Sequence, residues 1–309
     1  MSIPAQVEKS TSGIWRYRSY YPFVPKEYRL SLNEGETPEV KSEGIIFKRE
    51  DQNPTGSLKD RGMTYQISQA LAEGEEKLVI SSSGNAGISA AAYCRLAEIK
   101  LHVFVSPKIK SEKLKQIKKF GAEVYLSMRP VSEAIRFSQK TGFLNLRPSV
   151  QDNGLIGYQS LAFEIHRNLG RVDSIFIPVS SGTALVGMAE GYKTLGYLPQ
   201  LHLVQTTVVC PLAGLFDKDY QRSKTSLADA LVARIVPRKK EILKLVGDSG
   251  GGGWVISDEQ IEEAAKKLEN LGISTSAEGE AALAAIWKAK KKGKDLGEKV
   301  VCLLTGKKY

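Results

Sequence analysis

Short apolar runs alternate with stretches of helical periodicity along most of this 309-residue chain. The runs are rich in β-branched residues, which is typical of short strands buried on both faces of a sheet. Between them, apolar residues recur every three or four positions, as they do on the buried face of a helix. The predicted strands are 78–80, 101–105, 124–126, 175–177, 201–204 and 300–304; a helix is predicted from Lys59 onward, and others at 86–97, 111–120, 131–140, 158–168, 183–195, 258–271 and 278–291.

Buried strands joined by helices predict an α/β fold with mainly parallel sheets flanked by helices. The length is sufficient for two domains. Gly, Pro, Asn and Asp concentrate at 142–157, where we expect a boundary. The glycine-rich stretch 247–253 is expected to lie outside any helix or strand, either as a linker or as a loop close to the active site.

The composition is that of an ordinary globular protein, with 42% hydrophobic and 25% charged residues. No apolar run approaches the roughly 18 residues of a membrane span, and residues 1–12 lack the apolar stretch of a signal peptide. A cytoplasmic location without membrane association is therefore expected. The three cysteines and three histidines are scattered and fit no disulfide or metal-ligand spacing, so no metal site is predicted.

The net charge of +10 comes largely from lysine-rich, helix-like stretches at 108–119, 238–244 and 288–294. Lysines at such mixed spacing usually form a solvated helix face. They are not interleaved with aromatic residues and match no nucleic-acid motif, so no nucleic-acid partner is expected. An anionic substrate and a phosphorylated cofactor are other reasons for a basic protein.

The most informative string is Asn53-Pro-Thr-Gly-Ser-Leu-Lys-Asp-Arg-Gly62. It places Lys59 directly after a turn and at the start of a helix, where the helix dipole favours the neutral amine. A neutral lysine amine can form a Schiff base with an aldehyde cofactor. The string resembles the cofactor-lysine motif of the pyridoxal-phosphate (PLP) enzymes of the tryptophan-synthase β fold, and most closely that of the threonine synthases. The resemblance implies that Lys59 is the catalytic, cofactor-binding lysine.

A second string, Ser81-Ser-Ser-Gly-Asn-Ala-Gly87, follows a predicted strand and opens a helix. Small residues at a helix N-terminus expose backbone N–H groups, which makes an anion site. The string is similar to the loop by which the family binds the substrate carboxylate. The resemblance implies that Asn85 hydrogen-bonds the phenolic oxygen of the cofactor, and that the substrate is bound by Ser82, Ser83, Gly84 and Ala86.

Two further strings complete the resemblance. Val179-Ser-Ser-Gly-Thr-Ala-Leu-Val-Gly187 stands where the family has a glycine-rich loop for the cofactor phosphate, although only Gly182 remains inside the turn. The implied phosphate-binding residues are Ser180, Ser181, Gly182, Thr183 and Ala184. The strand ending Leu303-Leu-Thr-Gly306 resembles the threonine synthase strand whose threonine meets the pyridine nitrogen, a role that falls to Thr305. A neutral partner makes the cofactor a weaker electron sink, which suits elimination and replacement.

One departure concerns the substrate. Threonine synthases carry an Asn-Pro-x-Arg-x-Glu-Gly-x-Lys-Thr string whose arginine helps to bind the substrate phosphate. The matching stretch, Gln151-Asp-Asn-Gly-Leu-Ile-Gly-Tyr-Gln-Ser160, has Gly154 at the arginine position. Glycine cannot replace a bidentate anion clamp. Either Arg147 takes over this role, or the substrate is not O-phosphohomoserine.

The resemblance implies two domains, a smaller one at 46–145 and a larger one formed by 1–45 together with 146–309, with the cofactor in the interdomain cleft and a homodimeric assembly. The expected reaction is that of threonine synthase, a PLP-dependent lyase that converts O-phospho-L-homoserine and water to L-threonine and phosphate. Alternatives on the same fold are serine or threonine ammonia-lyase, a β-replacement synthase of the cysteine or cysteate type, and a PLP-binding protein without catalytic activity.

Overall fold

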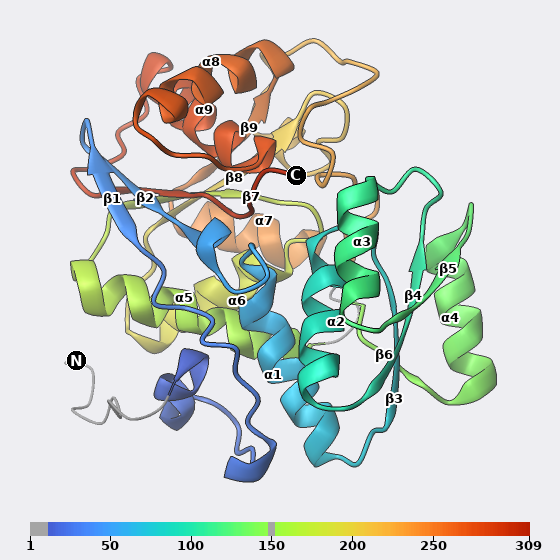
Figure 1. Ribbon diagram of the computed structural model, residues 1–309. Coiled ribbons are helices and arrows are strands. Elements are labelled where there is room, and N and C mark those ends of the chain that lie inside the picture. Colours follow the sequence, from blue (N-terminus) through green and yellow to red (C-terminus); the bar gives the residue numbers. More distant parts are fainter. Residues whose placement is uncertain (1–11, 148–151) are drawn as a thin grey trace. The chain divides into compact units, whose positions relative to one another are not determined.

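The computed structural model describes residues 12–147 and 152–309 (Figure 1). These residues form two compact units. Unit 1 comprises Thr37–Gln52 and Leu161–Lys308, and unit 2 comprises the described residues of Pro4–Glu36 and Asn53–Ser160 together with Tyr309. The division groups the described N-terminal segment up to Glu36 with Lys59, whereas the resemblance assigns that segment to the larger domain. The domain boundaries at 46–145 stay a prediction.

Unit 2 contains a four-stranded parallel sheet in the order β5-β4-β3-β6. Successive residues of a strand point to opposite faces, and this alternation divides the core into two layers. Leu78 and Ile80 of β3 pack with residues of α1, α2 and α3, whereas Val79 packs with Ala134 of α4. The elements are α1 (Lys59–Ala72), β3 (Lys77–Ser81), α2 (Asn85–Leu96), β4 (Lys100–Val105), α3 (Ser111–Lys119), β5 (Glu123–Leu126), α4 (Pro130–Thr141) and β6 (Leu144–Asn145).

Unit 1 contains a six-stranded sheet in the order β1-β2-β10-β7-β8-β9, in which only the β1–β2 pair is antiparallel. Helices α8 and α9 pack on one face of this sheet against Phe47, Phe176 and Trp254. The elements are β1 (Glu39–Ser42), β2 (Ile45–Lys48), β7 (Ser174–Pro178), α6 (Thr183–Thr194), β8 (Gln200–Thr206), α7 (Lys239–Asp248), β9 (Gly252–Ile256), α8 (Asp258–Asn270), α9 (Ala277–Lys291) and β10 (Val300–Leu303). Helix α5 (Asn153–Leu169) contains the division between the units, and short 3-10 helices lie at Gly13–Tyr20, Lys26–Tyr28, Glu50–Gln52 and Ala213–Leu215.

The α/β class with mainly parallel sheets is confirmed, and every strand and helix predicted from the pattern is present. The expectation that 247–253 lies outside any element is wrong, because Gly247 belongs to α7 and Gly252 opens β9. A Cβ on Gly251 would lie 2.0 Å from the Leu201 carbonyl oxygen, and one on Gly253 would lie 2.8 Å from the Ala213 Cα. These glycines therefore allow two backbone segments to approach closely. Composition alone does not distinguish such glycines from those of a flexible loop.

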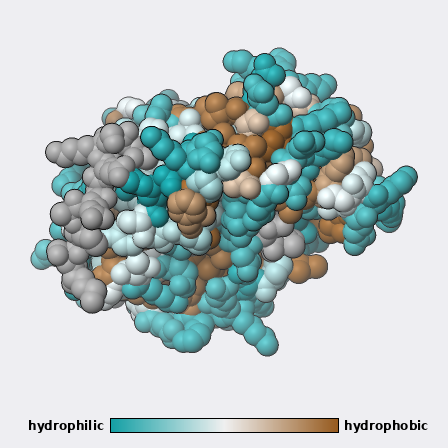
Figure 2. Space-filling view, turned by 90° about the horizontal axis from the view of Figure 1, so that it is seen from below, coloured by the Kyte–Doolittle hydropathy of each residue, from teal (hydrophilic) through white to brown (hydrophobic). Residues whose placement is uncertain are grey.

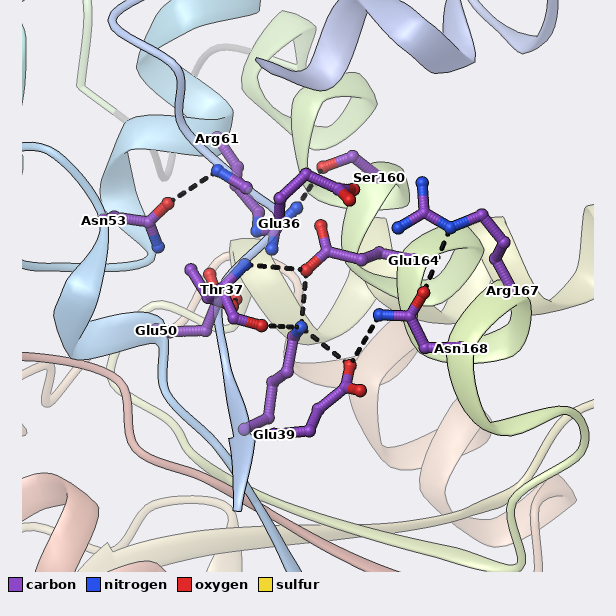
Figure 3. Close-up of polar contacts among 12 residues, drawn as sticks. Glu36, Thr37, Glu39, Glu50, Asn53, Arg61, Ser160, Glu164, Arg167 and Asn168 are labelled. Carbon is purple, nitrogen blue, oxygen red and sulfur yellow. Dashed lines mark hydrogen bonds and ion pairs between the residues drawn. The ribbon is translucent and has the colours of Figure 1, made fainter. Parts of the chain in front are cut away.

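A fully buried lysine, Lys48, ties the first strands of unit 1 to α5. Figure 3 shows its partners Thr37, Glu39 and Glu164. The Lys48 side chain has no exposed surface, and its Nζ donates to Glu164 Oε1 at 2.5 Å, to Glu39 Oε1 at 2.9 Å and to the Thr37 carbonyl at 2.7 Å. Asn168 also donates to the Glu39 carboxylate, at 3.0 Å. A buried charge is tolerated only when it is paired and hydrogen-bonded, and this cluster supplies both conditions.

The surface is mainly polar. Figure 2 shows one face that is largely hydrophilic, with apolar residues gathered in smaller patches. Among the residues that the structure describes, no helix has the length and apolar character needed to cross a membrane. Residues 1–11, on which the expectation about a signal peptide rests, and Gln151 of the departing string lie outside the described residues.

Candidate active site

Lys59 is the first residue of α1 and follows a tight turn. The Gly56 N–H donates to the Asn53 carbonyl at 2.7 Å, and Gly56 has a φ of +88°, which favours glycine. The half-buried Lys59 side chain places Nζ 5.7 Å from the centre of the Tyr158 ring. That ring lies against α1 because Gly62 has no side chain; a Cβ there would lie 2.6 Å from the ring. The turn thus sets the point from which the Lys59 side chain extends. The absence of a side chain on Gly62 lets the Tyr158 ring lie beside that side chain.

The residue after the lysine was missed as a site candidate. Asp60 is fully buried, and its carboxylate accepts hydrogen bonds from the Thr55 N–H at 2.7 Å, the Thr55 hydroxyl at 2.5 Å and the Ser89 hydroxyl at 2.6 Å. Burial raises the pKa of Asp60 to about 6, although the hydrogen bonds from Ser89 and Thr55 act in the opposite direction. Only its place next to Lys59 could have drawn attention to it in the sequence.

The predicted substrate loop connects β3 to α2, and the first helical residue is Asn85. The N–H groups of Asn85 and Ala86 lie in the first turn, where an α-helix offers no acceptor. A Cβ on Gly84 would meet nothing within 4 Å, so the space beside this backbone is open. Ser82 Oγ accepts from the Gly84 N–H at 3.3 Å, and Ser83 Oγ accepts from the Ser106 N–H at 2.8 Å. Two hydrogen bonds therefore anchor the loop, and the space beside Gly84, the residue that precedes α2, is open.

The Asn85 side chain is incompletely satisfied. Its Oδ1 is buried and has no hydrogen-bond partner among the described residues. An unpaired buried polar atom costs roughly 1–3 kcal/mol. A ligand group that donates a hydrogen bond to Asn85 Oδ1 would remove this cost, so the residue fits a position beside a polar ligand.

The predicted phosphate loop connects β7 to α6 in unit 1. Gly182 has a φ of +84°, and a Cβ on it would lie 2.1 Å from the Ile242 Cδ1 of α7. Thr183 and Ala184 form the buried first turn of α6, and the Ser181 and Thr183 hydroxyls lie 3.1 Å apart. First-turn N–H groups and adjacent hydroxyls are the donors that a phosphate dianion requires. Ile242, which covers this turn, carries no sequence signal.

Thr305 lies just beyond β10 and is 7% exposed. Its neighbours are anchored on both sides: the Leu304 N–H donates to the Lys48 carbonyl at 3.0 Å, and the Gly306 carbonyl accepts from the Ser276 N–H at 2.7 Å. Within the described part of the chain, no hydrogen bond to the Thr305 hydroxyl is found. The backbone on both sides of Thr305 is thus fixed in place, and the Thr305 hydroxyl is available to a ligand.

The structure groups the predicted residues by unit. In unit 1, the phosphate loop follows β7 and Thr305 follows β10, and these strands are hydrogen-bonded neighbours that run parallel. Both therefore lie at the carboxyl edge of one sheet, where α/β proteins bind ligands. In unit 2, Lys59 and the loop at 82–86 are linked through Asp60, which contacts the lysine turn and α2. Unit 2 carries two of the predicted cofactor-binding residues, Lys59 and Asn85, and unit 1 carries the other six.

The departing segment lies at the start of α5 in unit 2. A Cβ on Gly154 would meet only the Gln66 Oε1, at 3.5 Å, so a side chain could be accommodated there. Arg147 is half-buried, and its N–H donates to Asn145 Oδ1 at 3.1 Å. Ser160, at the threonine position of the family string, is fully buried and accepts from Arg61 Nη1 at 3.1 Å. At position 154, where threonine synthases have an arginine, this chain therefore has no side chain that could bind an anion.

Known proteins share both the sequence pattern and the fold. Threonine synthase from Methanocaldococcus jannaschii is 28% identical over 97% of this chain and 81% of its own. Threonine synthase from Bacillus sp. (strain ULM1) is 30% identical over 94% of this chain and 88% of its own. Among solved structures, maize serine racemase has a TM-score of 0.80 at 19% identity, covering 96% of this chain and 94% of its own.

A second solved structure, the processed form of threonine deaminase isoform 2 from Solanum lycopersicum, has a TM-score of 0.78 at 20% identity and covers 89% of this chain and 80% of its own. At this identity the two structures establish the fold alone. The family described as "Pyridoxal-phosphate dependent enzyme" matches residues 30–306, a range that includes the lysine turn, both loops and Thr305. This chain therefore belongs to the family of pyridoxal-phosphate-dependent enzymes.

Proposed function

We propose that the protein is a lyase of amino-acid metabolism that converts O-phospho-L-homoserine and water to L-threonine and phosphate. The observation that carries the proposal is Lys59 at the head of α1, in the same unit as a loop that opens α2 and has open space beside Gly84. The relatives named threonine synthase, similar over nearly the whole chain, support this reaction over others on the fold.

Pyridoxal 5'-phosphate is the cofactor of the family, and the donors of this chain fit it. Lys59 Nζ would hold the aldehyde carbon, and the side-chain N–H of Asn85 would donate a hydrogen bond to the phenolic oxygen. The loop from Ser180 to Ala184 would bind the phosphate, and the Thr305 hydroxyl would meet the ring nitrogen. When bound, the cofactor supplies an electron sink for negative charge that develops at the substrate Cα.

Residues of this chain bind the substrate and move its Cα proton. The first-turn N–H groups of α2, together with Ser82 and Ser83, bind the substrate carboxylate and thereby fix which Cα bond is broken. Lys59 Nζ, freed by the incoming substrate amine, removes the Cα proton as a general base. The neutral Thr305 hydroxyl leaves the ring nitrogen unprotonated, which favours elimination and replacement over transamination.

A second candidate function is favoured by Gly154. Without an arginine at this position, phosphate recognition falls to Arg147, which lies in the same unit. If Arg147 does not take that role, the same residues suit β-elimination from serine or threonine, or β-replacement on an activated serine. Those of these substrates that carry no phosphate group need no phosphate clamp.

The test is phosphate release from O-phospho-L-homoserine by the purified, PLP-loaded protein, with threonine measured in the same sample. Equal amounts of phosphate and threonine support the synthase. Arg147→Ala should then raise KM by tenfold or more, while Arg136→Ala, an exposed arginine on α4 of the same unit, should leave KM unchanged. No release from protein that retains its PLP absorbance rejects the synthase and directs assays to keto-acid formation from serine and threonine.

Assembly and location stay predictions. A homodimer is expected, and light scattering of the PLP-loaded protein at micromolar concentration would give the mass directly. A mass near twice the 33.9 kDa of the chain would support the dimer. A cytoplasmic location would be supported by recovery of the untagged protein in the soluble fraction of its own cells.

A further inference from the structure

We propose that Asp60 is a positioning residue that sets the spacing between Lys59 and Asn85, the two cofactor contacts of unit 2. The inference rests on the proposed function, because that function gives Lys59 and Asn85 their roles. Asp60 acts through its hydrogen bonds to Thr55 and Ser89, and not by touching the cofactor.

The contacts join two segments that are distant in sequence. Asp60 Oδ2 accepts the Thr55 N–H at 2.7 Å, and Oδ1 accepts the Thr55 hydroxyl at 2.5 Å, so both oxygens hold the turn that precedes Lys59. Oδ1 also accepts the Ser89 hydroxyl of α2 at 2.6 Å. One side chain thus binds the lysine turn and the helix that opens with Asn85.

The register of α2 makes this contact specific. Ser89 lies four residues after Asn85, which places the two side chains on the same face of the helix, one turn apart. Asp60 follows Lys59 directly and lies in the first turn of α1. A displacement of α1 at Asp60 is therefore transmitted to Lys59, which is the adjacent residue. A displacement of α2 at Ser89 is transmitted to Asn85, which lies one turn away.

The chemistry of the group argues for rigidity. Asp60 has no exposed surface, and a buried carboxylate carries a large desolvation cost. Hydrogen bonds to a carboxylate are shorter and stronger than those between neutral groups. Three such bonds hold the turn and α2 more tightly than an amide could, because an asparagine offers one acceptor oxygen and its amide nitrogen only donates.

The experiment compares Asp60→Asn and Ser89→Ala with a matched buried acid, Glu34→Gln. Glu34 is also fully buried in unit 2 and also binds α2, through the Tyr93 hydroxyl at 2.8 Å, but Tyr93 lies eight residues beyond Asn85. Each variant is purified without cofactor and titrated with PLP. The readouts are the PLP dissociation constant, the wavelength of the bound PLP band and the Tm of the cofactor-free protein.

We expect Asp60→Asn to weaken PLP binding at least tenfold and to shift the band, and Ser89→Ala to weaken binding about threefold. Glu34→Gln should lower the Tm by a similar amount but keep PLP affinity within twofold. If Asp60→Asn and Ser89→Ala lower the Tm yet bind PLP with the wild-type constant and band, Asp60 is only structural and the inference is wrong.

Borohydride reduction of the wild-type protein separates this failure from failure of the proposed function. Reduction should add the mass of reduced PLP to the peptide that contains Lys59. If the mass appears on Lys59 but the Asp60 variants behave like Glu34→Gln, only the positioning role fails. If no mass appears on Lys59, the assignment of the cofactor lysine fails, and the role of Asp60 fails with it.

Discussion

Arg61 and Ser160 connect the helix that begins at Lys59 with the helix that begins beside Gly154. The Arg61 guanidinium is fully buried and donates from Nη1 to Ser160 Oγ at 3.1 Å, while the Ser160 hydroxyl donates to the Gly157 carbonyl at 2.6 Å. The Ser160 hydroxyl thus accepts a hydrogen bond from a buried charge and donates one to a helix carbonyl.

Replacing this serine should destabilise the protein. Ser160→Ala removes an acceptor from a buried guanidinium, and a lost hydrogen bond to a charged group costs about 1.5–3 kcal/mol. Urea unfolding of the cofactor-free protein measures the change in the free energy of unfolding. Ser111→Ala, at the exposed start of α3, is the control and should change it by less than about 0.5 kcal/mol. Equal effects of the two variants would contradict the importance of the Arg61–Ser160 contact.

The buried Lys48–Glu164 pair should respond differently to single and double replacement. Glu164→Ala leaves the Lys48 charge without its nearest carboxylate, which should cost about 3–5 kcal/mol. Lys48→Met combined with Glu164→Leu removes both charges and should recover most of that loss, because neither charge then has to be desolvated. Denaturant unfolding of the wild-type protein, the Glu164→Ala variant and the double variant checks this. Lys244→Ala, which breaks an exposed pair with Asp248, should cost under about 0.5 kcal/mol.

Asp60 should make stability depend on pH. Its folded-state pKa of about 6 lies above the ordinary value of 3.8, so the folded protein binds a proton that the unfolded chain has released. The resulting stabilisation is complete below pH 3.8 and is lost as pH rises through 6. Relative to Asp60→Asn, the wild-type protein should lose up to about 3 kcal/mol between pH 4 and pH 7. Parallel pH dependence of the two unfolding free energies would refute this.

Gly182 should be needed for cofactor binding. Gly182→Ala places a methyl group 2.1 Å from Ile242 Cδ1, at a φ of +84° that costs a non-glycine residue about 1–2 kcal/mol. We expect PLP affinity to fall at least tenfold, as measured by absorbance titration. Adding Ile242→Ala removes the clash but not the backbone strain, so it should restore affinity only in part. Full affinity of Gly182→Ala alone would show that the loop tolerates a side chain.

Gly154 offers a gain-of-function test. The space around it would accept a side chain, since a Cβ would meet only Gln66 Oε1 at 3.5 Å. Gly154→Arg should raise kcat/KM for O-phospho-L-homoserine by about tenfold, equivalent to about 1.4 kcal/mol, if phosphate recognition limits the reaction. Gly154→Gln, of similar reach but neutral, should not. Loss of activity in both variants would mean that the space is needed for something other than phosphate.

Local patterns predicted most of the elements because their signals lie within the elements themselves. Each helix from α1 to α6 coincides with a stretch of helical periodicity in the sequence. The capping box of Ser257 and Gln260 marks the start of α8. Strands β1, β6 and β9 were missed because β1 is largely polar, β6 has two residues and β9 begins with two glycines. Strand β2, Ile-Ile-Phe-Lys, carries an apolar signal, although it is not among the strands predicted from the sequence.

The candidate site could be proposed from the sequence only where its residues are contiguous. Lys59, Asn85 and Gly182 lie in short motifs whose turn chemistry is local. Asp60 and Ile242 contact residues that are distant from them in sequence, and only the fold brings these contacts about. No single stretch of sequence contains that information.

The position of β10 has a consequence for the order in which the protein can become functional during synthesis. This strand comes last in the chain order yet pairs with β2 on one side and β7 on the other. Until the ribosome has released it, β2 and β7 each have an open edge, and Thr305 does not yet exist beside the phosphate loop. If the phosphate loop and Thr305 bind the cofactor together, as proposed, unit 1 can do so only after β10 has been synthesised, and chains truncated before Val300 would expose two unpaired strand edges to aggregation.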